Sequence, residues 1–145
     1  MFLQCNPYIN SITALEDIRR KCPELKIVVI TARPAWKYSF LVYQTYKWLH
    51  YHGINTDLLL FNKDKADAVI DNLNVNNVIY FIEDRDKHAV EISNIGIDVL
   101  LIAKPYNENI SDSNNLSKVY SWDTIKNKVI DKYHTIMNQR SDMNG

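Results

Sequence analysis

Four short apolar runs, separated by segments with helical periodicity, constrain the fold most strongly. The runs lie at residues 27–30, 58–61, 78–82 and 99–102. Such runs are typical of strands buried on both faces of a parallel sheet. Strands that alternate with helices at this spacing predict an α/β fold, a three-layer sandwich with a mostly parallel sheet and right-handed crossovers.

The segments between the runs predict the helices and loops. One helix opens at Ser11 or Thr13 and ends at Pro23. Further helices are expected at 35–51, 66–73, 87–94 and 122–137, a loop at 106–118, and a frayed tail at 139–145. The prediction is therefore one domain over residues 1–138, followed by a disordered tail.

Composition excludes several classes of protein. The 145 residues carry 17 basic and 17 acidic side chains, so no net positive field favours nucleic acid. No apolar stretch has the length of a membrane span, and the N-terminus lacks a secretory signal pattern. Two cysteines, Cys5 and Cys22, are too few for a disulfide framework. We expect small core cysteines in a reduced, cytoplasmic protein with no membrane partner.

Polar side chains follow three successive runs where each predicted strand ends. They are Thr31, Ala32 and Arg33, then Lys63 and Lys65, then Glu83 and Asp84. The carboxyl ends of parallel strands lie at one edge of a sheet, where α/β proteins bind ligands. A hydroxyl and cations suit phosphate, and paired carboxylates suit Mg²⁺. The sequence therefore predicts a phosphate and magnesium pocket at this edge.

Each feature alone also has a structural explanation. Thr31 could cap a turn, a lone lysine is usually a solvated charge, and acids near a helix start complement its dipole. The aromatic side chains of residues 36–51 are more often packing groups than a base-stacking platform. The order of hydroxyl, amine and acid after successive strands is what favours a site.

The motifs in this order resemble the haloacid dehalogenase (HAD) superfamily. The resemblance rests on Ile-Thr-Ala-Arg-Pro at 30–34, Trp-Leu-His-Tyr-His-Gly-Ile at 48–54, Lys65, and Ile-Glu-Asp-Arg at 82–85. It is strongest to the 5′-nucleotidase and 5′(3′)-deoxyribonucleotidase branch and covers about residues 11–135. Residues 104–107 and 119–122 are similar to the closing segment of that branch. Residues 45–103 are also similar to the phosphatase part of phage polynucleotide kinases.

The resemblance implies a Rossmann-like, HAD-type domain without a cap and a role for each matching residue. Thr31 would bind the transferring phosphoryl group, Lys65 would neutralise it, and Asp84 would act with them in catalysis. Ala32, Arg33 and Lys63 would assist phosphate binding, Lys63 being the alternative to Lys65. Glu83 and Asp84 would bind Mg²⁺. The implied ligand is a phosphorylated small molecule such as a nucleoside monophosphate.

The chain departs from this family at the nucleophile. The family uses an Asp-x-Asp motif after its first strand, and residues 1–8 contain no acidic residue. A displaced motif at Asp84-Arg85-Asp86 would invert the family order. A covalent mechanism needs an activated carboxylate, so we expect impaired or absent hydrolysis and weak or absent Mg²⁺ binding. The alternatives are a non-catalytic nucleotide-binding or partner-binding regulator, and the C-terminal part of a split phosphatase.

The strand that carries the absent motif lies in the middle of the family's sheet. Leaving it out would expose two unpaired strand edges. Three arrangements are then open. Residues 1–5 form the strand, the flanking strands pair directly, or a partner chain or second copy supplies it.

Overall fold

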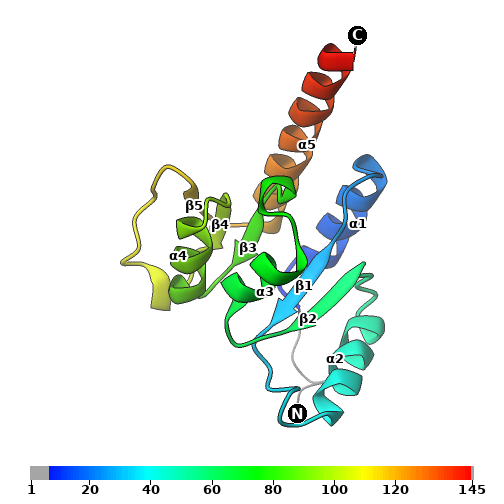
Figure 1. Cartoon of the computed structure of the whole chain (residues 1–145), viewed down its shortest axis with the longest axis vertical. Coiled ribbons are helices and arrows are strands. Elements are labelled where there is room, and N and C mark those ends of the chain that lie inside the picture. Colours follow the sequence, from blue (N-terminus) through cyan, green and yellow to red (C-terminus); the bar gives the residue numbers. More distant parts are fainter. Residues whose placement is uncertain (1–6, 145) are drawn as a thin grey trace.

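The computed structural model describes residues 7–144, which form a mixed α/β fold (Figure 1). The helices are α1 (Ser11–Lys21), α2 (Phe40–Tyr51), α3 (Lys65–Asn72), α4 (Asp86–Asn94) and α5 (Trp122–Asn144), with short 3₁₀ turns η2 (Val75–Asn77) and η3 (Pro105–Asn107). The strands are β1 (Val28–Thr31), β2 (Leu58–Phe61), β3 (Phe81–Glu83), β4 (Val99–Ile102) and β5 (Leu116–Val119). Strands and helices alternate along most of the chain, as predicted.

The strands form two parallel sheets. In the first, β1 pairs with β2 so that Val28 lies opposite Leu58 and Thr31 opposite Phe61. In the second, β4 lies between β3 and β5 and is parallel to both. The predicted parallel pairing is confirmed within each sheet.

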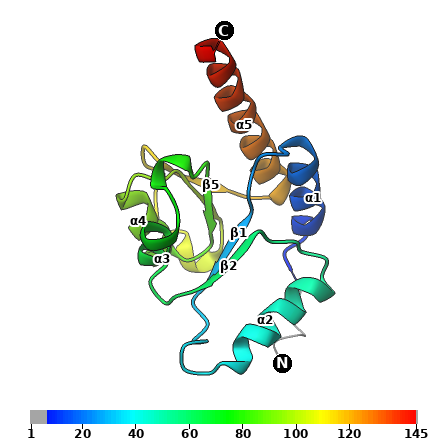
Figure 2. The same cartoon turned by 45° about the vertical axis from the view of Figure 1, so that its right-hand side comes forward.

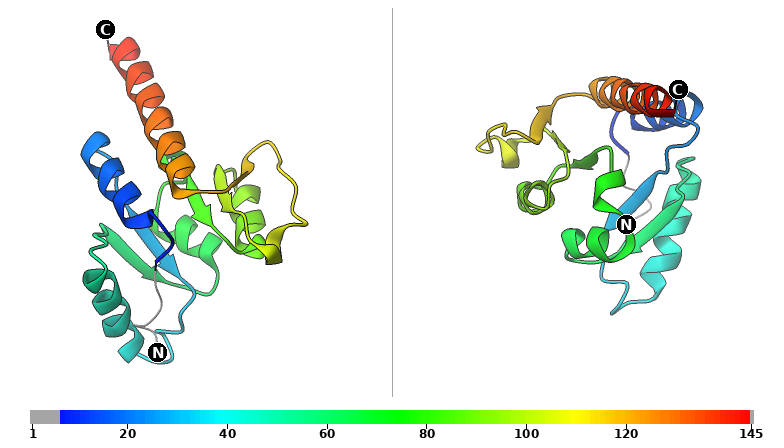
Figure 3. Two further views of the ribbon diagram at one scale, coloured as in Figure 1. Left: turned by 180° about the vertical axis from the view of Figure 1, so that it is seen from behind. Right: turned by 45° about the horizontal axis from the view of Figure 1, so that its top comes forward.

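Alternate side chains of β4 build a core on each face of the second sheet. Leu100 packs in a cluster with Ile18 of α1 and Ile125 of α5. Val99 and Leu101, on the opposite face, pack with residues of α3 and α4. Figure 2 shows α1, α2 and α5 on one side of the strands and α3 and α4 on the other, and Figure 3 shows α1 beside α5. Helices therefore cover both faces of this sheet.

A groove of about 860 Å³ separates the two sheets. Val28, Val29 and Ile30 of β1 line one side, and Phe81 and Ile82 of β3 line the other. Because one edge of β1 lies along this groove, its four residues are all half-buried, which corrects the prediction of a strand buried on both faces. Among the described residues, β1 and β3 do not pair, so the hypothesis of direct pairing is wrong.

The structure corrects two predictions near the C-terminus. The predicted loop 106–118 contains η3 and runs into β5, whose Leu116 and Val119 are buried. Only tertiary contact with β4 explains this strand, because its sequence, Leu-Ser-Lys-Val, has no strand period. Helix α5 continues to Asn144, so residues 139–144 are helical where a disordered tail was expected. No proline or glycine interrupts this polar segment before Gly145.

Other boundaries differ from the predictions less. Helix α2 begins at Phe40 and not at 35, and β3 begins at Phe81 and not at 78. The buried stripe predicted for the closing helix is confirmed at Ile125, Val129 and Tyr133. Cys22 is buried with a free thiol, whereas Cys5 and the proposed strand 1–5 lie outside the described residues. Among the described helices, none has the length and apolar character of a membrane span.

Candidate functional site

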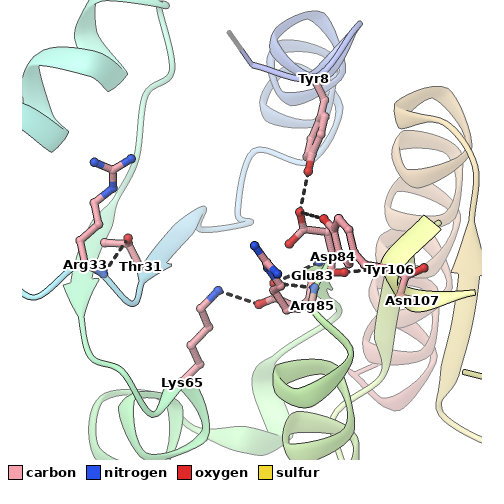
Figure 4. Close-up of polar contacts among 9 residues, drawn as sticks. All are labelled: Tyr8, Thr31, Arg33, Lys65, Glu83, Asp84, Arg85, Tyr106 and Asn107. Atoms are coloured by element: carbon pink, nitrogen blue, oxygen red, sulfur yellow. Dashed lines mark hydrogen bonds and ion pairs between the residues drawn. The ribbon is translucent and has the colours of Figure 1, made fainter. Parts of the chain in front are cut away.

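The carboxyl ends of β1, β2 and β3 bring the predicted polar residues to one edge of the fold (Figure 4). Thr31 ends β1, Lys65 begins α3 just after β2, and Glu83 ends β3. Lys65, Glu83 and Asp84 all line the groove between the sheets, whereas Thr31 does not. In the view of Figure 4, the Lys65 side chain reaches toward Glu83, with Thr31 and Arg33 on the side away from Asp84.

Lys65 and Glu83 form a largely buried ion pair between the first residue of α3 and the end of β3. Lys65 Nζ lies 2.7 Å from Glu83 Oε2, and the two side chains are 14% and 4% exposed. Glu83 Oε1 accepts hydrogen bonds from the backbone N–H groups of Asp84 and Arg85. Both carboxylate oxygens are thus engaged, and the pair holds the start of α3 against the end of β3.

Helix α3 is positioned by a side-chain cap. Asp64 is the N-cap, and its Oδ1 accepts a hydrogen bond from the backbone N–H of Asp67 at 3.0 Å. The Asp64 backbone N–H in turn donates a hydrogen bond to Asn62 Oδ1. This turn places Lys65 at the first helical position, facing the groove.

Asp84 lies between two tyrosine hydroxyls. Its Oδ2 accepts hydrogen bonds from Tyr8 Oη at 2.5 Å and Tyr106 Oη at 2.7 Å. Burial would raise the pKa of Asp84, but these hydrogen bonds outweigh burial and lower its pKa below the usual aspartate range. Burial and the bond to Asp84 raise the pKa of both Tyr8 and Tyr106 above the ordinary tyrosine value.

Two cations lie over the rings of these tyrosines. Lys104 Nζ is 4.2 Å from the ring centroid of Tyr8, and the Arg85 guanidinium is 4.8 Å from that of Tyr106. Contacts of this kind hold a cation by the negative face of the ring. Two hydroxyls thus bind Asp84, and the ring behind each hydroxyl has a cation over its face.

Asn107 fixes the loop that carries Tyr106. The residue is 1% exposed, and its Nδ2 donates to the carbonyl oxygens of Asp84 and Ile102, each at 2.8 Å. Its Oδ1 accepts from the Lys104 backbone N–H. The family resemblance includes residues 104–107 but gives no role to Tyr8, Tyr106 or Asn107. Nothing local in the sequence signals the contacts of these three residues with Asp84, which lies 22 or more residues away from each of them.

The remaining predicted phosphate ligands lie away from the groove lining. Thr31 Oγ1 accepts a 3.3 Å hydrogen bond from the Arg33 backbone N–H, which makes it a local turn cap in this structure. Arg33 is half-buried, whereas Ala32 and Lys63 are exposed. The structure thus distinguishes the two candidate lysines, because Lys65 lines the groove and Lys63 does not.

The carboxylates of this edge do not by themselves fit a magnesium site. Within residues 7–144, no group of three His, Cys, Asp or Glu side chains is arranged to hold a metal. Glu83 already binds Lys65 and two backbone N–H groups, and both tyrosines bond to Asp84 Oδ2. Among the contacts of the described residues, only Asp84 Oδ1 of these two carboxylates accepts no hydrogen bond and remains for Mg²⁺, which binds oxygen ligands.

Comparisons of the chain with protein-family models, curated proteins and solved structures find no match. The function is consequently inferred from the residues and geometry of this chain.

Proposed function

We propose that the chain is a HAD-like, nucleotidase-type domain that binds a phosphorylated small molecule at the carboxyl edge of its strands. A nucleoside monophosphate is the ligand class that the motif resemblance implies. The observation that carries the proposal is the Lys65 ammonium, held by Glu83 at the end of the groove and beside Asp84. An ammonium has three N–H donors, so Lys65 can bind a phosphoryl oxygen in addition to Glu83.

Neighbouring cations support an anionic ligand. Arg33 follows β1, and Arg85 and Lys104 lie over aromatic rings next to Asp84. The Thr31 hydroxyl, which accepts the Arg33 N–H, still has its own O–H to donate to a phosphate oxygen.

The same groups do not supply efficient hydrolysis. Glu83 is consumed by the ion pair, and Asp84 is held by two hydroxyl donors that make its carboxylate a weaker nucleophile and base. Positioning and charge neutralisation remain available. The proposal is therefore a phosphate-binding domain with impaired or absent phosphatase activity.

Calorimetry tests the binding. Inorganic phosphate and nucleoside monophosphates are titrated into the wild-type chain and into a double variant, Lys65→Met with Glu83→Gln. This variant removes the cation without leaving a buried carboxylate alone, and the introduced amide keeps an acceptor for the backbone N–H groups. We expect at least tenfold weaker binding, while the Lys63→Met control retains wild-type affinity. Equal affinity in the double variant, or no heat with any phosphate in wild type, contradicts the proposal.

A turnover assay tests whether phosphatase activity is impaired or absent. We expect no hydrolysis of p-nitrophenyl phosphate or nucleoside monophosphates above background with Mg²⁺ present. Hydrolysis that disappears in Asp84→Asn would show that the isolated chain is an active phosphatase.

A second candidate function is partner binding through α2. Large apolar side chains on α2 and the turn before it are exposed, including Trp36, Phe40, Tyr43, Tyr46 and Tyr51. Exposed apolar patches of this kind often mark interaction surfaces. Analytical ultracentrifugation tests whether α2 mediates self-association. In that case the wild type is a dimer, and the double variant Tyr43→Lys with Tyr46→Lys is a monomer. A wild type that is monomeric at all concentrations contradicts self-association through this face.

A further inference from the structure

The Asp84 carboxylate has one oxygen that is fully used and one that is available. Oδ2 accepts the hydroxyl protons of Tyr8 and Tyr106, and a carboxylate oxygen has about two sites for hydrogen bonds. Oδ1 accepts no hydrogen bond from the side chains or backbone of residues 7–144. In the view of Figure 4, this second oxygen is turned toward the side on which Lys65 lies. An acceptor is therefore available at the end of the groove.

The backbone around Asp84 fixes the direction of this acceptor. Its carbonyl oxygen accepts a hydrogen bond from Asn107 Nδ2 at 2.8 Å, and its N–H donates to Glu83 Oε1 at 3.0 Å. Asn107 is 1% exposed and also binds the carbonyl of Ile102 at the end of β4. The residue is thus held through its backbone and through one carboxylate oxygen. A ligand meets Oδ1 in a fixed position, which lowers the ordering cost of binding.

Donors for an anion lie at the same end of the groove. Lys65, Glu83 and Asp84 all line it, and Lys65 Nζ uses one of its three N–H donors on Glu83 Oε2. Asp84 follows Glu83 in the chain and lines the same groove, so an anion bound by Lys65 has the Asp84 carboxylate as a neighbour. The groove end therefore combines donors for phosphate with one acceptor.

A carboxylate beside a bound phosphate repels it unless a hydrogen-bond donor lies between the two anions. The tyrosine hydroxyl bonds keep the pKa of Asp84 below its usual range, so the carboxylate only accepts hydrogen bonds. A divalent ion could bridge the two anions, but no group of three His, Cys, Asp or Glu side chains within residues 7–144 is arranged to hold one. The alcohol part of a phosphate monoester can supply the donor instead, as an O–H group.

We propose that Asp84 is a specificity-determining residue, whose Oδ1 accepts a hydrogen bond from a hydroxyl group of a phosphate monoester bound at Lys65. This inference rests on the proposed function, because it needs the phosphoryl group to lie at Lys65. It narrows the ligand class to polyol and sugar phosphates, which carry hydroxyls close to the phosphate. The sugar of a nucleoside monophosphate belongs to this class, whereas simple alkyl phosphates do not.

Two esters with the same carbon skeleton test the need for a hydroxyl. Glycerol 3-phosphate carries hydroxyls on the skeleton of n-propyl phosphate, and both esters have the same charge at neutral pH. Calorimetry measures the affinity of the wild-type chain for both esters and for inorganic phosphate, first in EDTA and then with Mg²⁺. We expect glycerol 3-phosphate to bind about tenfold more tightly than n-propyl phosphate in EDTA, because the alkyl ester leaves a charged acceptor unpaired.

Variants of Asp84 test whether this residue supplies the acceptor. In Asp84→Asn, the tyrosine hydroxyls hold the amide oxygen, so the amide NH₂ replaces Oδ1 at the groove. We expect this variant to lose the preference for glycerol 3-phosphate and to bind inorganic phosphate more tightly, because a negative charge is removed. Asp84→Ala should lose the preference as well. Asp86→Asn is the matched control and should keep it, since Asp86 lies outside the groove lining and accepts the Lys87 backbone N–H.

Opposite effects on the two measurements separate this role from a loss of folding, because a misfolded variant binds every phosphate more weakly. Equal affinity of the wild type for the two esters overturns the hydroxyl contact and leaves the proposed function standing. The absence of binding to any phosphate overturns both. A preference that needs Mg²⁺ overturns the inference, because Asp84 would then act through a metal ion. A preference that persists in Asp84→Asn and Asp84→Ala overturns it too.

Discussion

Asp84 is the residue on which the chemistry of this edge depends. Two tyrosines from distant parts of the chain donate to one of its oxygens, and Asn107 binds its backbone carbonyl. The carboxylate is consequently held in position and stabilised in its charged form. A side chain in this state orients neighbours and balances cations better than it accepts a proton.

The lowered pKa of Asp84 predicts an acid-sensitive contribution to stability. A group whose pKa is lower in the folded state stabilises the fold above its unfolded pKa, and this stabilisation is lost as pH falls toward the folded value. We expect the urea midpoint of the wild type to fall between about pH 5 and pH 2 more steeply than that of Tyr8→Phe with Tyr106→Phe. Identical slopes would show that the hydroxyls do not stabilise the carboxylate.

The Lys65–Glu83 pair predicts a contrast between single and double variants. Lys65→Met leaves the Glu83 carboxylate buried without its cation and should cost about 3–5 kcal/mol of unfolding free energy. Adding Glu83→Gln should recover much of this loss, because neither charge is then left alone. Urea denaturation of the wild type, the single variant and the double variant at neutral pH measures these unfolding free energies, with Lys63→Met as the surface control. Equal stability of the single and double variants would contradict a buried, coupled pair.

Among the helices and strands, α3 matters most for the site, because its first turn determines where Lys65 lies. The Asp64 cap ends the loop after β2 and begins the helix at Lys65. Helix α2, by contrast, has no side-chain cap bond at Ser39, and of its residues only Thr45 and Leu49 are buried. The element that carries the site residue is thus anchored at its first turn, whereas the aromatic helix contributes little to the core.

Removing the cap of α3 should weaken both the fold and the site. Asp64→Ala leaves the Asp67 backbone N–H without its acceptor and should cost about 1 kcal/mol. Phosphate affinity should fall with it, because the first turn positions Lys65. Asp71→Ala, on the exposed last turn of the same helix, is the matched control and should be neutral or slightly stabilising. Urea denaturation and phosphate calorimetry measure both variants, and a cap variant as stable as the control would exclude this role for Asp64.

At the scale of the whole molecule, stability is unequally distributed. The second sheet is covered on both faces, and Val99, Leu100 and Leu101 of β4 are each at most 1% exposed. The first sheet has half-buried strands, and Leu58 of β2 is 39% exposed. Contacts between the two halves include the Lys65–Glu83 pair at the functional edge, Ile30 of β1 against the core of the second sheet, and the packing of α1 on α5.

This asymmetry predicts the order of amide exchange. The amides of β4 should exchange slowest, by global unfolding, and those of β1 and β2 faster, by local opening. Residue-resolved exchange by NMR at neutral pH provides the measurement. Protection of Val28–Thr31 equal to that of Val99–Ile102 would show that the two sheets open as one unit.

Local sequence patterns determined much of the architecture and little of the site. Hydrophobic periodicity, together with residues that end helices and strands, located α1, α4, β2, β4 and the apolar stripe of α5, because short-range preferences fix these elements. The position of Lys65, Glu83 and Asp84 at one edge followed from the parallel arrangement. Tertiary structure decided the rest: the pairing of β5, the division into two sheets, the choice of Lys65 over Lys63, and the enclosure of Asp84 by Tyr8, Tyr106 and Asn107. Those features depend on burial and hydrogen bonds between residues far apart in the chain, which no local pattern records.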